Sequence, residues 1–177
     1  RFRNVTGVQT CALPISFFNT NRMVRDYFEQ YYLPAQLRWQ KLSRNKMQLV
    51  KEVAAWKERV QSLWGKVHIL KVDSEEGGEV RVGGRLAIST MVNCDGLKPE
   101  ELRVEIYYGP LDSDEEIVDG QSTVMEQVEQ VRKNVYRFEA TIPCEPTGQH
   151  GYRIRIMPVH PEMAHTFDGG LITWLQE

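Results

Sequence analysis

The pattern of apolar and polar positions is helical in residues 17–63. Between Thr20 and Pro34 the apolar side chains recur about one helical turn apart, and Arg22, Arg25, Asp26 and Glu29 surround them. This spacing predicts an amphipathic helix with Thr20 as its N-cap, and Pro34 either ends that helix or starts the next. The apolar stripe consists of Met23, Val24, Tyr27, Phe28 and Tyr31.

A second, longer helix is predicted from Leu37 to Leu63, with Lys, Arg and Glu opposite one apolar face. We interpret Trp39, Trp56 and Trp64 as packing residues. A helix pair of this amphipathic character needs a surface on which to lie. The residues of the apolar face are Val50, Val53, Ala54, Val60 and Leu63.

After Gly65 the pattern alternates with a period of two, which is typical of strands. Turn residues separate the alternating segments, and the acidic stretch 111–120 is expected to be a solvated hairpin tip. A further strand pair is predicted around Lys133 and Asn134. The class is therefore α+β, an N-terminal helical segment followed by an antiparallel, immunoglobulin-like β-sandwich. The five clearest strands are KVHILKVD (66–73), RLAISTMVN (85–93), LRVEIYYG (102–109), VYRFEATIP (135–143) and GYRIRIMPV (151–159).

Charge and cysteine content limit the classes of function. The 177 residues carry 22 Lys and Arg against 24 Asp and Glu, a formal net charge of −2, which argues against a nucleic-acid partner. No apolar run approaches the roughly 20 residues of a membrane helix, so we expect no membrane partner. Cys11, Cys94 and Cys144 form an odd set without CxxC spacing, which indicates free thiols and a cytoplasmic location.

The opening residues do not follow either pattern. The stretch VTGVQTCALPIS (5–16) is broken by Thr, Gly, Gln and Pro, so it is neither a secretory signal nor a mitochondrial presequence. It resembles a translated sequencing-library adapter, and a native N-terminal loop is the alternative. We therefore expect three parts: residues 1–16 as a non-native segment, 17–63 as a helical segment, and 64–177 as the sandwich.

A search for chemistry assigns no catalytic, cofactor-binding or metal residue. His160 and His165 lie five apart, which is not a ligand spacing, and Gly83-Gly84 is read as a strand turn and not a phosphate loop. The acidic clusters DSEEGGE (73–79), KPEE (98–101) and DSDEE (112–116) are expected to be solvated. These residues alone indicate a non-catalytic chain.

One segment resembles a known family. FFNTNRMVRDYFEQYYLPA (17–35) is similar to the last helical stretch of the catalytic region in α-glucan (glycogen/maltodextrin) phosphorylases, particularly the prokaryotic form with an extra C-terminal domain. Segments 54–60, 96–112, 135–165 and 170–174 resemble that form's C-terminal tail. The matching residues in the first segment are Asn19, Thr20, Arg22, Met23, Val24, Tyr27, Tyr31, Tyr32, Pro34 and Ala35.

The resemblance implies the function of a larger parent enzyme. Such enzymes cleave α-1,4-glucan with phosphate to α-glucose 1-phosphate, using pyridoxal phosphate held on a lysine. In the family the lysine motif and the phosphate and glucose sites precede residue 17, so no cofactor and no activity are expected on this chain, and a missing catalytic body would pack on residues 17–63. The lysines that should not be assigned the Schiff base are Lys41, Lys46, Lys51, Lys57, Lys66 and Lys71.

Two other roles stay open, a carbohydrate-binding module and an oligomer-docking element. Aromatic side chains of the strands could stack on sugars, although alternation turns about half of them into the core. Two or more exposed, coplanar rings on one sheet face would favour the binding role. The candidate rings are Tyr107, Tyr108, Tyr136, Tyr152 and Trp174.

Overall fold

The computed structural model describes residues 19–74, 83–144, 148–163, 167 and 169–175. The chain divides into two compact units, Arg1–Ala54 and Ala55–Glu177. The adapter-like segment 1–16, with Cys11, lies outside the described residues, and so does His165.

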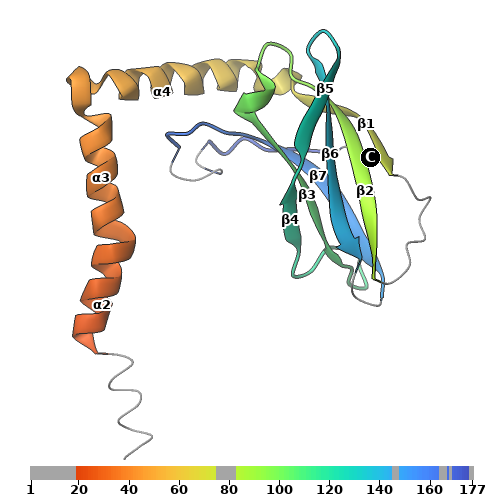
Figure 1. The fold of residues 1–177 in the computed structure, drawn as a ribbon, viewed down its shortest axis with the longest axis horizontal. Coiled ribbons are helices and arrows are strands. Elements are labelled where there is room, and N and C mark those ends of the chain that lie inside the picture. The colour runs from red at the N-terminus through yellow and green to blue at the C-terminus, as the bar shows by residue number, and fades with distance from the viewer. Residues whose placement is uncertain (1–18, 75–82, 145–147, 164–166, 168, 176–177) are drawn as a thin grey trace, which may run out of the picture. The chain divides into compact units, whose positions relative to one another are not determined.

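The first unit is helical and its helix begins one residue earlier than predicted. Asn19, not Thr20, is the N-cap, because its side-chain oxygen accepts a hydrogen bond of 2.7 Å from the backbone N–H of Arg22. Pro34 does not stop the helix, since it lies in the first turn of α3, where its missing N–H costs nothing. The elements are α2 (Thr20–Tyr27), the π-helical turn η1 (Phe28–Tyr32), α3 (Leu33–Leu42) and the start of α4 (Arg44–Leu63), as Figure 1 shows.

The prediction of one helix from Leu37 to Leu63 is wrong. The backbone of Asn45, Lys46 and Met47 is left-handed, with φ of 50°, 57° and 60°, so α3 and α4 are separate helical segments. Ser43 closes the last turn of α3, since its N–H donates to the carbonyl of Trp39 at 2.9 Å and its hydroxyl to that of Gln40 at 3.4 Å. The first of these is an ordinary helical bond, whereas the hydroxyl bond to Gln40 is a local side-chain bond of the kind that weakens a helix.

The amphipathic stripe of α2 and η1 is exposed. Its five side chains are between 50% and 60% exposed, and no described residue of α2, η1 or α3 is buried. Trp39 is also 61% exposed, so its interpretation as a packing residue is wrong, whereas Trp56 and Trp64 are buried as predicted. An apolar surface of this extent marks a site of interaction.

The second unit contains two antiparallel four-stranded sheets, which confirms the α+β class. All five strands predicted individually are present, and so is the strand pair around Lys133 and Asn134. One sheet has the order β1-β2-β6-β5 and the other the order β4-β3-β7-β8. The strands are β1 (His68–Ser74), β2 (Gly84–Asn93), β3 (Leu102–Pro110), β4 (Gln121–Val124), β5 (Glu126–Arg132), β6 (Val135–Cys144), β7 (His150–Pro158) and β8 (Thr173–Trp174).

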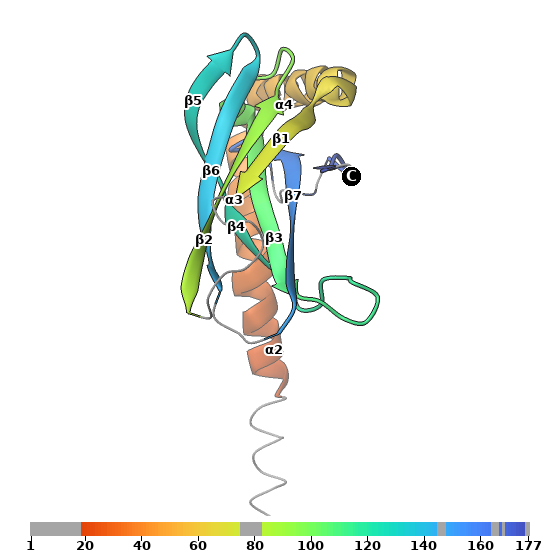
Figure 2. The same cartoon turned by 90° about the vertical axis from the view of Figure 1, so that its right-hand side faces the viewer.

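Figure 2 shows the strands of the two sheets. Alternate residues of these strands form the core. Ile88 of β2, Ile106 of β3 and Ile154 of β7 are at most 1% exposed, and each buried side chain of this kind stabilises the fold by about 1.5–3 kcal/mol. The strand β5 lies at a sheet edge, and its pairing with β6 shifts register twice. The acidic 111–120 connection is largely exposed, as predicted for a hairpin tip.

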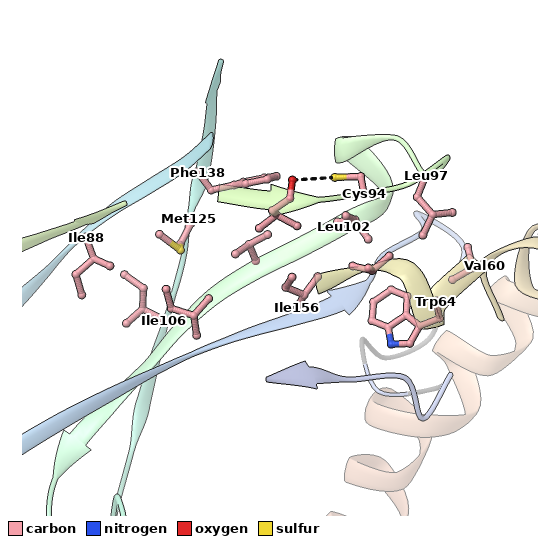
Figure 3. Close-up of a cluster of buried hydrophobic side chains, with 14 of the residues drawn as sticks. Val60, Trp64, Ile88, Cys94, Leu97, Leu102, Ile106, Met125, Phe138 and Ile156 are labelled. Carbon is pink, nitrogen blue, oxygen red and sulfur yellow. Dashed lines mark hydrogen bonds between the residues drawn. The ribbon is translucent and has the colours of Figure 1, made fainter. Parts of the chain in front are cut away.

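The last turns of α4 belong to the same core. Trp56 and Val60 of α4, followed by Trp64 of the short helix η2 (Trp64–Lys66), are buried in one cluster with residues of both sheets. Figure 3 shows Val60 and Trp64 beside Leu102 and Ile156. The second unit therefore consists of two four-stranded sheets and a helical end that share one core.

The difference in burial predicts a difference in hydrogen exchange. Backbone amides of α2, η1 and α3 should exchange about a hundredfold or more faster than those of β2, β3 and β6, because no described side chain of these helices is buried. Exchange followed by mass spectrometry on the 177-residue chain measures this difference. Equal protection in the helices and the central strands would contradict it.

Candidate functional site

Glu101 links α4 to the sandwich. It ends the short helix η3 (Pro99–Glu101), and its carboxylate accepts hydrogen bonds from the indole N–H of Trp56 at 2.9 Å, from the backbone N–H of Lys98 at 2.9 Å and from the Arg59 guanidinium. Its side chain is only 15% exposed. The expectation that the KPEE acids are solvated is therefore wrong for Glu101, because three donors replace its water.

The aromatic candidates divide into two groups. Tyr108, Tyr136 and Tyr152 pack against the core. Tyr107 and Trp174 lie on the outer face of the β4-β3-β7-β8 sheet, where their ring centroids are 6.2 Å apart at an interplanar angle of 75°. Because these rings meet edge to face, they do not form the coplanar pair that a sugar-stacking platform needs.

An arginine occupies the space among the outer rings. The guanidinium carbon of Arg155 lies 5.2 Å from the ring centroid of Tyr107, 5.6 Å from that of Phe167 and 5.7 Å from that of Trp174, all within cation–π range. The rings therefore hold a side chain of their own protein. They attach the segment after β7 to the sheet.

A buried carboxylate fixes that arginine. Glu105 of β3 is 2% exposed, and it accepts two hydrogen bonds from Arg155, at 2.9 and 2.7 Å, and one from Arg103 at 2.5 Å. Sequence reasoning missed this network. The signal was an acid within the alternating RVEIYY segment, with arginines at matching positions of β3 and β7.

The outer face of the other sheet carries a groove of about 680 Å³. Its lining combines apolar side chains, including Ala87, Met91 and Val124, with polar and charged ones from β2, β6 and β5, namely Arg85, Ser89, Arg137, Glu139 and Glu126. No sequence pattern singled out this face, because its polar residues are ordinary outward positions of three alternating strands. Their proximity follows only from the strand order.

The remaining nucleophilic and titratable candidates have structural roles. Burial, followed by the charge of Glu100, raises the pKa of the Cys94 thiol to about 12, so this buried thiol is unreactive. His160 packs on the Trp56 ring, with 4.8 Å between the ring centroids, and its Nδ1 accepts a hydrogen bond from the Glu162 N–H.

Within the described residues, no group of three or more His, Cys, Asp or Glu side chains could hold a metal ion. The helices of that same part of the chain are all too short or too polar to cross a membrane.

A comparison with known proteins identifies the family to which the two-sheet unit belongs. Residues 64–176 match the family model described as glycogen phosphorylase C-terminal domain, a range that holds both sheets. The chain belongs to this family. The resemblance seen in the sequence is thus confirmed, and the glycogen phosphorylase C-terminal domain corresponds to the two-sheet fold described above.

The curated relatives of this chain are named as phosphorylases, and they are much longer than the chain. A glycogen phosphorylase of Mycobacterium bovis is 30% identical over 154 residues, which is 86% of this chain and 18% of the relative. A maltodextrin phosphorylase of Thermococcus litoralis is 30% identical over 165 residues, which is 89% of this chain and 18% of the relative. The chain therefore spans less than a fifth of the length of these relatives.

The environment of Glu101 predicts a pH dependence of stability. Burial alone would raise the pKa of Glu101, but hydrogen bonds from Arg59, the Lys98 N–H and Trp56 hold it below its usual value near 4.5. Because the folded pKa is the lower one, the stabilisation is complete above about pH 4.5 and is lost as the pH falls through the folded value.

Glu101→Gln should lower the free energy of unfolding by about 1–3 kcal/mol at pH 7 and flatten its slope below pH 5. Urea unfolding from pH 3 to 7 measures both effects. Glu100→Gln, at the exposed neighbouring residue, is the matched control and should change little. Identical pH slopes in wild type and Glu101→Gln would contradict the assignment.

The outer ring cluster predicts the effect of a single methyl group. A Cβ added at Gly120 would overlap the ring tip of Tyr107, whereas a Cβ at Gly65 would meet no atom within 4 Å. Gly120→Ala should therefore lower the free energy of unfolding by about 1–3 kcal/mol. Gly65→Ala should leave it unchanged within about 1 kcal/mol. Thermal unfolding of the two variants side by side tests this, and equal stability would show that Tyr107 is free to move.

Proposed function

We propose that this chain is the C-terminal part of an α-glucan phosphorylase. The whole enzyme cleaves α-1,4-glucan with inorganic phosphate and releases α-glucose 1-phosphate. The observation that carries the proposal is the match of the sandwich to the glycogen phosphorylase C-terminal domain. The names of the relatives, a glycogen and a maltodextrin phosphorylase, support the same reaction.

The described residues do not fit a site for pyridoxal phosphate, the cofactor proposed for the whole enzyme. A lysine that forms a Schiff base is activated in a desolvated or positively charged pocket. Every lysine of this chain is described and exposed, from Lys41 to Lys133. We therefore place the cofactor and the phosphate-binding residues outside this chain and assign no catalytic residue within it.

The chain has two parts in this proposal. Residues 17–63 are the helical end of the catalytic region, and their exposed stripe packs on the catalytic body. Residues 64–177 are an accessory sandwich of immunoglobulin-like type, and residues 1–16 are a non-native segment. The support is the exposure of the stripe and the start of the family match at residue 64. The free Cys94 and Cys144 support a cytoplasmic location.

The proposal is tested with the gene read upstream of residue 17. The longer protein should show the absorbance of a pyridoxal phosphate aldimine and release glucose 1-phosphate from maltodextrin and phosphate. The 177-residue chain should do neither, because catalysis needs the lysine aldimine and the phosphate site together.

Borohydride reduction and peptide mapping locate the cofactor in the same experiment. The expected label lies on a lysine upstream of Phe17. A specifically labelled lysine within residues 17–177 would overturn the placement of the active site, and a longer protein without phosphorolysis would overturn the function.

A further inference from the structure

The groove on the outer face of β1-β2-β6-β5 is lined by side chains of both charges. Strand pairing sets Asp73 beside Ser89, Ser89 beside Glu139, and Glu139 beside Glu126, so one row crosses all four strands. Arg137, two residues before Glu139 on β6, forms an ion pair with it at 2.5 Å. Glu126 and Glu139 remain like charges on directly paired residues, an arrangement that costs stability.

Several side chains of the groove have no polar partner. Within the part of the chain that the structure describes, the side chains of Arg85, Ser89, Glu126 and Thr141 form no hydrogen bond or ion pair, although all four residues line the groove. Ser89 is half-buried between β1 and β6, so its hydroxyl is partly removed from bulk water. The groove thus offers unused donors and acceptors side by side.

The charges of the lining disfavour cationic and anionic ligands and favour a neutral one. Arg85 and Arg137 disfavour a cation, and Asp73, Glu126 and Glu139 disfavour an anion. A carboxylate accepts hydrogen bonds, a guanidinium donates them, and a hydroxyl does both. A neutral ligand with many hydroxyl groups satisfies all of these side chains at once, because each of its hydroxyls donates and accepts.

We propose that this groove binds a short segment of α-1,4-glucan, outside any catalytic site. The choice of glucan among hydroxylated ligands rests on the proposed function. The volume of about 680 Å³ is within the range of small-molecule sites. The described residues that line the groove include no aromatic side chain, so we expect no stacking and a dissociation constant of the order of millimolar.

NMR titration of the 177-residue chain with maltohexaose, up to about ten times the millimolar constant expected, tests the site. Saturable shifts should appear at Ser89, Glu139 and Thr141. Arg85→Ala and Glu126→Gln should each weaken binding about threefold or more. The first removes a charged donor, the second replaces a charged acceptor by a neutral amide, and neither breaks an existing ion pair. The control Arg153→Ala removes an exposed arginine from β7 in the other sheet and should leave the affinity unchanged.

Each other outcome overturns the site. Absence of shifts in the groove, shifts centred on Tyr107 and Trp174, or equal binding in Arg85→Ala, Glu126→Gln and wild type would each do so. Saturation of the groove by inorganic phosphate alone would show an anion site instead.

Phosphorolysis by the longer protein is measured separately. If it persists while the groove binds no maltohexaose, only this inference fails. If the groove binds and the longer protein has no phosphorolysis, the proposed function fails.

Discussion

The structure of the second unit depends on one shared core, in which the end of a helix and two sheets bury the same apolar surface. Val60 and Trp64 lie among the inward residues of β2, β3 and β7, and Trp56 closes the cluster while its indole N–H is bonded to Glu101. A sandwich of two four-stranded sheets could be covered by loops alone. Here the helix end is instead held by apolar contact and by a charged acceptor, so its direction relative to the strands is fixed by two different forces.

The strands β1, β2, β3, β6 and β7 were predictable because each has at least seven residues, and an alternating pattern of that length can be read without knowledge of the partner strand. The core residues Ile88, Ile106 and Ile154 follow from the same alternation. The helical stripe was also predictable, whereas its exposure became visible only in the structure. These features depend on local periodicity, which a single sequence contains in full.

The errors have a different physical origin. The break between α3 and α4 lies in the left-handed backbone of Asn45, Lys46 and Met47, and the apolar period of the sequence continues across it. Asn19 and Thr20 are both good caps, and only the geometry of the first turn selects between them. Glu101 and Glu105 were invisible as buried acids because their donors, such as Trp56 and Arg155, are 45 and 50 residues distant in sequence. Register and chain direction create such sites, and neither is contained in composition.

The same dependence on register gives the two outer sheet faces different surfaces. On the β3-β7-β8 face, aromatic rings that look like sugar platforms in the sequence surround Arg155, so their π-faces are already used. On the β2-β6 face, residues without any notable motif converge. Aromatic content alone therefore does not identify a free stacking surface among the described residues, because the outer rings contact a side chain of their own chain.

The irregular pairing of β5 has a consequence for association between molecules. A straight, regular edge strand would present a continuous row of N–H and C=O groups to any neighbouring chain. The two register shifts in β5 interrupt that row, and Glu126, Glu129 and Arg132 place charges along it. The β5 edge is thereby less open to pairing with a second copy of the chain, whereas the apolar stripe of α2 and η1 stays exposed.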